Sequence, residues 1–228
     1  MELFASIFSF LQASFLDWFV HLFQIFLHID KYLGSVISEY GFWTYLILFI
    51  VIYCETGLVV TPFLPGDSLL FAAGSFAAIG ALNPFILYII ILTATILGDN
   101  SNYWIGYYVG PRVFTEKVRF LKREYLEKTH KFYEKYGVKT VIIARFVPIV
   151  RTFAPFVAGI GKMAYRKFLP FDMAGAFLWV TIFVFAGYFF GQLSFVKNNF
   201  SYVVLVIILI SITPIIIEFF RNKMAVRT

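Results

Sequence analysis

The chain has 228 residues, of which 61% are hydrophobic and only 14% are charged, and 30 of them are phenylalanine. This composition excludes a soluble domain and predicts an all-α integral membrane protein. The single cysteine, Cys54, excludes an internal disulfide, and the three histidines are scattered without zinc-type spacing. We therefore expect no metal and no cofactor.

The net charge of +6 is concentrated in basic clusters at 112–139, 162–167 and 221–227. The positive-inside rule places these clusters, and with them the C-terminus, in the cytoplasm. The clusters also suit anionic lipid headgroups, although charge that only sets the topology is the simpler interpretation. Nucleic-acid binding is not expected.

The first segment, 1–34, is an apolar stretch whose polar residues recur at three- and four-residue spacing. Such spacing predicts one polar stripe along a helix. The stripe fits an interfacial helix in the membrane plane, or a spanning helix with its polar face toward the bundle. The side on which the N-terminus lies stays open.

Residues 42–82 contain two uncharged runs of 13 and 15 residues around a polar centre. Each run reaches about 20 Å as a helix, which is short of the roughly 30 Å hydrocarbon core. The residues that break the helix between the runs are Pro62, Pro65 and Gly66. We interpret the segment as a re-entrant hairpin that carries Glu55 and Asp67 into a polar site. Two short, tilted spanning helices with an external loop are the alternative.

A helix over 84–109 is long enough to span, and it carries a polar cluster near its middle. Such a cluster should face the protein interior. Asp99 and Asn100 are therefore a possible secondary polar site, either functional or only buried and hydrogen-bonded. The charged stretch that follows, 111–139, has charge pairs at four-residue spacing, which predict an amphipathic helix on the cytoplasmic surface.

The segment 141–161 is apolar apart from two arginines, and both of its flanks are basic. It is therefore predicted to enter and leave on the cytoplasmic face as a second re-entrant hairpin. The hairpin-breaking residues are Pro148, Pro155 and Gly159. A helix over 168–196 then spans outward, and the last segment, 197–228, spans back and ends in a basic tail.

Each hairpin with its spanning helix forms one copy of an internal repeat, 35–110 and 140–196. An offset of 96 residues aligns Glu55 with Arg151, and with a gap the glycine-bounded ends of the two spanning helices also align. Because an odd number of crossings separates the copies, their orientations are opposite. Inverted repeats with broken helices that meet near the midplane are typical of secondary transporters.

In this arrangement Glu55 meets Arg151 near the pseudo-two-fold axis, with Asp67 and Arg145 nearby. A charge at the bilayer centre costs at least about 2.5–3.5 kcal/mol, so these four groups need partners or water. One interpretation is a set of salt bridges that holds the hairpins together. In the other, the arginines bind phosphate through their fork of donors, while the carboxyl groups exchange protons. That chemistry describes a proton-linked carrier of an anion.

Three motifs carry a family resemblance: Pro65-Gly66-Asp67-Ser68, Gly98-Asp99 with Tyr103 to Gly106, and Arg145-x5-Arg151-Thr152. Over about residues 35–195 the chain resembles the DedA family of membrane proteins, which is similar to a wider group that includes eukaryotic lipid scramblases. The resemblance implies a multi-pass protein of the bacterial inner membrane. It also implies that such a protein returns undecaprenyl phosphate to the cytoplasmic leaflet, with dependence on the proton motive force. Two positions depart from the family pattern, Ala144 in place of a common glycine and Tyr107 in place of a basic residue.

The sequence thus predicts a lipid-phosphate flippase and not an enzyme. Arg145 and Arg151 are expected to bind the phosphate, and Glu55 and Asp67 to couple protons or to form ion pairs. The alternatives are a proton-coupled antiporter of small cations or drugs and a general phospholipid scramblase. A lipid-phosphate phosphatase is disfavoured, because no histidine lies near the arginines to act as an acid–base group. The expected partners are the lipid, protons and the membrane, and a homo-oligomer is compatible with the sequence.

Overall fold

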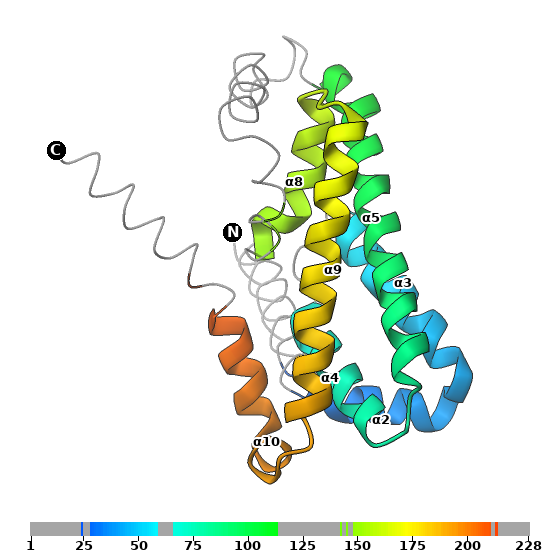
Figure 1. Ribbon diagram of the computed structural model, residues 1–228, viewed down its shortest axis with the longest axis vertical. Helices are drawn as coiled ribbons and strands as arrows, with labels where there is room; N and C mark the ends of the chain where they lie inside the picture. The colour runs from blue at the N-terminus through cyan, green and yellow to red at the C-terminus, as the bar shows by residue number, and fades with distance from the viewer. Residues whose placement is uncertain are drawn as a thin grey trace, which may run out of the picture.

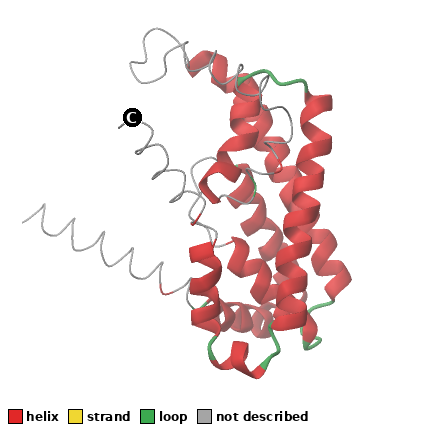
Figure 2. Cartoon of the chain, turned by 60° about the vertical axis from the view of Figure 1, so that its left-hand side comes forward, coloured by secondary structure: helices red, strands yellow, loops and turns green. Residues whose placement is uncertain are grey.

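The structure, a computed structural model, describes residues 24, 28–58, 66–113, 142, 145, 148–210 and 213. Within these residues the regular elements are helices and no strand occurs (Figures 1 and 2). In chain order they are α2 (Ile29–Tyr40), a 3-10 turn η1 (Gly41–Trp43), α3 (Thr44–Gly57), α4 (Gly66–Ala78), α5 (Pro84–Val113), α8 (Pro148–Ile160), α9 (Tyr165–Phe190) and α10 (Ser194–Asn198). A further helical stretch covers 200–210. The all-helical prediction is confirmed for this part of the chain.

Three segments are long and apolar enough to cross a membrane: Ile29–Gly57, Pro84–Val109 and Tyr165–Phe190. Two of them coincide with α5 and α9, whose 30 and 26 residues give lengths of about 45 and 39 Å. These two helices run along the long axis of the molecule (Figure 1). Large apolar side chains are exposed on both, which suits contact with lipid tails and confirms an integral membrane protein.

The segment Ile29–Gly57 is not one straight helix. Gly41 has φ of +51° and separates α2 from η1 and α3, a conformation that glycine adopts without steric cost. Figure 1 shows α2 lying across the lower end of the bundle, while α3 rises from there to mid-height. The predicted boundary at residue 34 therefore falls inside one helix, and the rest of the predicted segment 1–34 lies almost entirely outside the described residues.

The helices α3, α4 and α8 are short, with 14, 13 and 13 residues. At about 1.5 Å per residue each reaches roughly 20 Å, less than the hydrocarbon thickness. Figure 1 shows α4 in the lower half of the molecule and α8 in the upper half. Their first turns, at Gly66 and Pro148, and the last turn of α3 therefore bring the polar ends of three helices to the middle of the bundle.

The predicted helix breakers have different outcomes. Gly66 and Pro148 are the first residues of α4 and α8, as expected of breaking residues, because a proline at the first helical position loses no hydrogen bond. Pro155 and Gly159, by contrast, do not interrupt α8, which continues to Ile160. Pro155 lacks a backbone donor, and α8 nevertheless continues through it while packed against α5. Pro62 and Pro65 lie outside the described residues, as does nearly all of the predicted amphipathic helix 111–139.

Glycine allows α4 to pack closely against α9. A Cβ added at Gly74 would lie 2.1 Å from the carbonyl oxygen of Val184, and one added at Gly187 would lie 1.9 Å from that of Phe71. Each glycine thus meets the carbonyl three residues before the other glycine. The largest hydrophobic core surrounds this crossing and joins α2, α3, α4, α5 and α9 with the stretch 200–210.

The same pattern recurs where α5 packs against α8. A Cβ at Gly106 would lie 2.2 Å from the carbonyl oxygen of Phe156, and one at Gly159 would lie 2.1 Å from that of Tyr103. Again each glycine meets the carbonyl three residues before its partner. The crossing of α4 with α9 and the crossing of α8 with α5 therefore have matching contacts. The second core cluster, Tyr103, Ala158 and Phe168, lies beside this second crossing.

The end of α9 differs from the prediction of a helix over 168–196. The helix begins three residues earlier and ends at Phe190, where the chain turns at Gly191 and then forms α10. Gly191 packs against Ser75, whose side chain would lie 2.4 Å from an added Cβ. Gln192 follows and donates to the carbonyl oxygen of Ser75 at 2.7 Å. These contacts with α4 fix the turn.

Candidate functional site

The middle of the bundle holds a buried ion-pair cluster around Arg151. Arg151 lies in the first turn of α8, Glu55 near the end of α3 and Asp67 in the first turn of α4. The guanidinium donates through Nη2 to Glu55 Oε1 at 2.5 Å and through Nη1 to Asp67 Oδ1. The Glu55 side chain is 1% exposed and that of Arg151 is 9% exposed. One guanidinium therefore joins the three short helices.

Trp179 of α9 completes this cluster. Its indole Nε1 donates to Asp67 Oδ1 at 2.8 Å, and the Arg151 Cζ lies 4.9 Å from the centre of its ring. The ring thus orients the carboxylate and also attracts the cation over its face. The absence of a side chain at Gly66 makes room for the Glu55 carboxyl group, because a Cβ at Gly66 would lie 2.2 Å from Glu55 Oε2.

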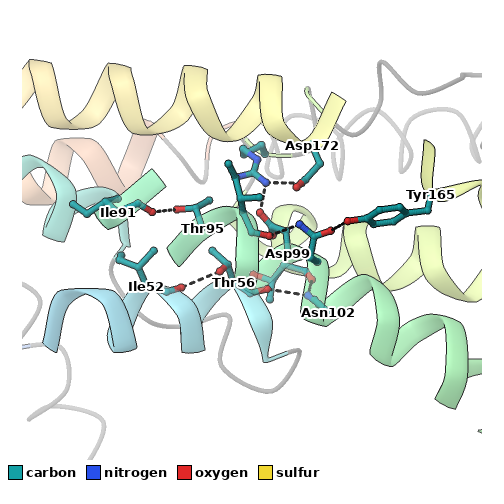
Figure 3. Close-up of polar contacts among 12 residues, drawn as sticks. Ile52, Thr56, Ile91, Thr95, Asp99, Asn102, Tyr165 and Asp172 are labelled. Carbon is teal, nitrogen blue, oxygen red and sulfur yellow. Dashed lines mark hydrogen bonds and ion pairs between the residues drawn. The ribbon is translucent and has the colours of Figure 1, made fainter. Parts of the chain in front are cut away.

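A second cluster surrounds Arg145, which lies just before α8. Its Nη2 donates to Asp172 Oδ1 of α9 at 2.7 Å and also to Asp99 Oδ2 of α5. Figure 3 shows these two aspartates on the two long helices, facing the same guanidinium. All three side chains are buried. Buried charges of this kind are expected to be paired, as they are here.

Asn102 of α5 joins the two halves of the site. Its side-chain amide donates to the backbone oxygen of Thr56 at 3.0 Å and to that of Thr152 at 2.6 Å (Figure 3). The sequence offset of 96 residues that aligns Glu55 with Arg151 also aligns these two threonines. One amide therefore contacts corresponding carbonyls of α3 and α8.

A small cavity lies between the two clusters. Its volume is about 10 Å³, and both arginines, Asp99 and Trp179 line it together with Thr56 and Thr152. Such a volume holds about one water molecule. The cavity is therefore too small for a group larger than water unless the surrounding side chains move.

The charges of the two clusters do not balance. Two guanidinium groups face four carboxyl groups, Glu55, Asp67, Asp99 and Asp172. If all were ionised, the described part of the site would carry a formal charge of −2. A buried site with this excess favours uptake of positive charge, and a proton is the simplest form.

The structure brings together three of the predicted site residues, Glu55, Asp67 and Arg151, and places Arg145 in the neighbouring cluster with Asp99. The predicted partner Asn100 does not join either cluster. Its side chain accepts from the Tyr165 hydroxyl at 2.6 Å and donates to the Ile96 carbonyl.

Several residues of the site were not predicted, among them Asn102, Asp172 and Trp179. An ionisable residue inside a spanning helix is itself a functional signal, and Asp172 meets that criterion. Its position soon after the basic residues at 162–167 made it resemble an interfacial residue. Trp179 offered no signal among so many aromatic residues.

Comparison with known proteins gives consistent matches. The family model of the VTT domain matches residues 64–189. Protein DedA of Escherichia coli K12 is 51% identical over 213 residues, which cover 92% of this chain and 97% of that protein. An uncharacterized membrane protein of Mycobacterium tuberculosis H37Rv is 41% identical over 179 residues, 75% of this chain and 76% of its own. The inner membrane protein YqjA of Escherichia coli K12 is 32% identical over 149 residues, 65% and 68% of the two chains. No solved structure matches significantly.

Proposed function

Since the chain belongs to the DedA family of VTT-domain membrane proteins, we propose that it carries a polyprenyl phosphate across the bacterial inner membrane in a proton-linked cycle. Undecaprenyl phosphate is the substrate that the family resemblance implies. The observation that carries the proposal is the buried Arg151, held at once by Glu55 and Asp67. A guanidinium that is released from these two carboxylates presents a fork of donors suited to a phosphate headgroup.

Protons provide the means of release. While Glu55 and Asp67 are ionised, they occupy the donors of Arg151, and a phosphate would be repelled by their charge. Protonation of the two acids weakens both ion pairs and removes the repulsion. On the side where protons are abundant the site therefore accepts phosphate. On the other side, loss of the protons lets the carboxylates reclaim the arginine and expel the phosphate.

The proposed architecture is an inverted repeat of two re-entrant hairpins, the first including α3 and α4 and the second including α8. The short lengths of α3, α4 and α8, each less than the thickness of the hydrocarbon core, support the proposal of re-entrant hairpins. The matching glycine contacts of the α4–α9 and α8–α5 crossings support the repeat. Alternating access would then be a rocking of one repeat against the other, with the arginines near the midplane. The basic clusters, including that at 162–167, would face the cytoplasm, and so would the C-terminus.

Binding of undecaprenyl phosphate to the purified protein tests the proposal. We expect the wild type to bind more tightly as the pH falls, and Arg145→Ala and Arg151→Ala to lose binding. Lys31→Ala, which changes an exposed lysine of α2, is the control and should bind normally. An ordinary phospholipid, phosphatidylglycerol, serves as the control ligand.

Two results would contradict the proposal. Equal binding by the wild type and by folded arginine variants would leave the arginines with a structural role. Equal binding of phosphatidylglycerol would favour a general phospholipid scramblase.

The second candidate function is antiport of protons against a small cation or drug. The excess of carboxyl groups over guanidinium groups in the described site favours it, because a cation would relieve that excess. The arginines oppose it by repelling a cation. Proteoliposomes with an imposed pH gradient distinguish the two functions. An antiporter dissipates the pH gradient when the cation alone is added, whereas a lipid carrier does not.

A further inference from the structure

The cluster around Arg145 has one acid more than it has cations. A single nitrogen, Nη2, donates both to Asp99 and, at 2.7 Å, to Asp172 Oδ1. The three side chains are at most 6% exposed. One guanidinium balances one carboxylate, so two ionised aspartates would leave an unpaired negative charge in the interior. Such a charge is strongly disfavoured where water cannot reach it.

One carboxyl oxygen of this cluster has no hydrogen-bond partner among the described residues. Asp172 Oδ2 is buried and accepts no hydrogen bond from any residue that the structure describes. Both oxygens of an ionised carboxylate are acceptors, and a buried one without a donor is unfavourable. A neutral carboxyl group is favoured because protonation removes the uncompensated buried charge, and a proton on Oδ2 leaves Oδ1 free to accept from Arg145.

Helix α9 is shaped to admit the guanidinium. Gly175 follows Asp172 by three residues and therefore lies on the same face of the helix. A Cβ at Gly175 would lie 3.2 Å from Arg145 Nε, which is tighter than normal contact. The Asp172 carboxyl group and the space left by the missing side chain of Gly175 together form the surface of α9 that the Arg145 guanidinium contacts.

No other described group supplies the missing positive charge. Arg151 of α8 lines the adjoining cavity, but it is already held by Glu55 of α3 and Asp67 of α4. The Tyr165 hydroxyl of α9 donates to Asn100 instead of to either aspartate. The described residues contain no group of three or more acids, histidines or cysteines arranged for a metal ion, and the cavity of about 10 Å³ has room for about one water. The cation that fits is a proton.

From these contacts we propose that the pair Asp99 and Asp172 holds a single proton, on Asp172 Oδ2, and forms a second proton-binding site beside Glu55 and Asp67. Asp99 is the ionised partner of Arg145. The part this site plays in transport rests on the proposed function, because a further exchangeable proton would add one to the number coupled to each phosphate. The existence of the site does not depend on transport.

Infrared spectroscopy of the full-length protein in lipid nanodiscs, without added substrate, tests the inference. A protonated buried carboxyl group has a carbonyl stretch that an ionised one lacks. We expect the wild type at neutral pH to show this band. Asp172→Asn removes the group that carries the proton, and Asp99→Asn leaves Asp172 as the only counter-ion of Arg145. Each variant should therefore lose the signal of one protonated carboxyl group per chain.

Two variants serve as controls. Asp172→Glu keeps a carboxyl group at the site and should keep the band. Glu39→Gln removes an exposed carboxylate of α2 and should also leave the band unchanged. Size-exclusion profiles establish that each variant is folded before its spectrum is compared.

Carboxyl spectra that are identical in the wild type, Asp172→Asn and Asp99→Asn would overturn the inference, and so would loss of the band in Glu39→Gln. The outcome is independent of lipid transport. A protein that retains the band but moves no polyprenyl phosphate contradicts only the proposed function. A protein that moves the lipid but lacks the band contradicts only the second proton site.

Discussion

Arg151 of α8 depends on neighbours from three other helices. Its two carboxylate partners come from α3 and α4, and Trp179 of α9 lies under its guanidinium. A buried ion pair adds little net stability, but removal of one partner leaves an uncompensated charge. The charge balance around this residue is therefore the feature most sensitive to substitution.

We predict that Arg151→Leu lowers the free energy of unfolding by about 3–5 kcal/mol at neutral pH. The loss should shrink as the pH falls, because protonation of Glu55 and Asp67 removes the unpaired charge. Denaturant titration in mixed micelles measures it. The triple variant Arg151→Leu, Glu55→Gln, Asp67→Asn removes both signs of charge and should recover most of the lost stability. A cost below about 1 kcal/mol for Arg151→Leu, as for an exposed pair, would show that the cluster is solvated.

At the scale of elements, glycine determines how closely the helices approach. The α5–α8 and α4–α9 crossings both place a glycine against a backbone carbonyl, which cannot move as a flexible side chain would. Close approach at these points is what brings Asp99 of α5 and Arg151 of α8 to the same cavity. A larger side chain in place of a glycine at either crossing should therefore lower the stability of the protein and displace residues of the site.

Gly106→Ala tests this packing. The added methyl group would lie 2.2 Å from the carbonyl oxygen of Phe156, so α5 and α8 must separate. We expect a loss of about 1–3 kcal/mol in the free energy of unfolding. Gly34→Ala in α2 is the matched control, because the added group meets only the Phe76 ring at 3.2 Å and the ring can shift. Equal effects of the two substitutions would contradict the role assigned to the crossing.

Several elements were predictable because their signals are local. The breaks predicted at Gly66 and Pro148 fall at the residues where α4 and α8 begin. The break at Gly41 falls directly before the predicted start of the hairpin at residue 42, but the positive φ that ends α2 there is not recorded in the pattern of apolar residues. The pairing of Arg145 with Asp99 and Asp172 was also missed. Which acid faces that guanidinium depends on how α9 packs against its neighbours, and no spacing in the sequence records that packing.

At the scale of the whole molecule, the long helices α5 and α9 run along its length (Figure 1). The last turn of α3 and the first turns of α4 and α8 carry the charged residues Glu55, Asp67 and Arg151. The confirmed family and the apolar exposed surface agree with a membrane protein of this kind. In the proposed orientation the turn between α4 and α5 faces the periplasm, and the turn between α8 and α9 faces the cytoplasm.

Thiol labelling in a Cys54→Ala background tests this orientation. Asn83→Cys lies just before α5 and Lys162→Cys just after α8. An impermeant maleimide should label Asn83→Cys in intact cells, and Lys162→Cys only after the membrane is opened. Labelling of both from the same side would contradict the inverted arrangement of the hairpins.

The most direct test of the central claim is transfer of undecaprenyl phosphate across proteoliposomes under an imposed pH gradient. An external phosphatase reports how much headgroup remains accessible. The wild type should move the lipid faster toward the alkaline side, Glu55→Gln should lose the response to the gradient, and Arg151→Ala should lose transfer altogether. Lys31→Ala should match the wild type. Transfer by folded Arg151→Ala at the wild-type rate would contradict the claim that this arginine carries the phosphate.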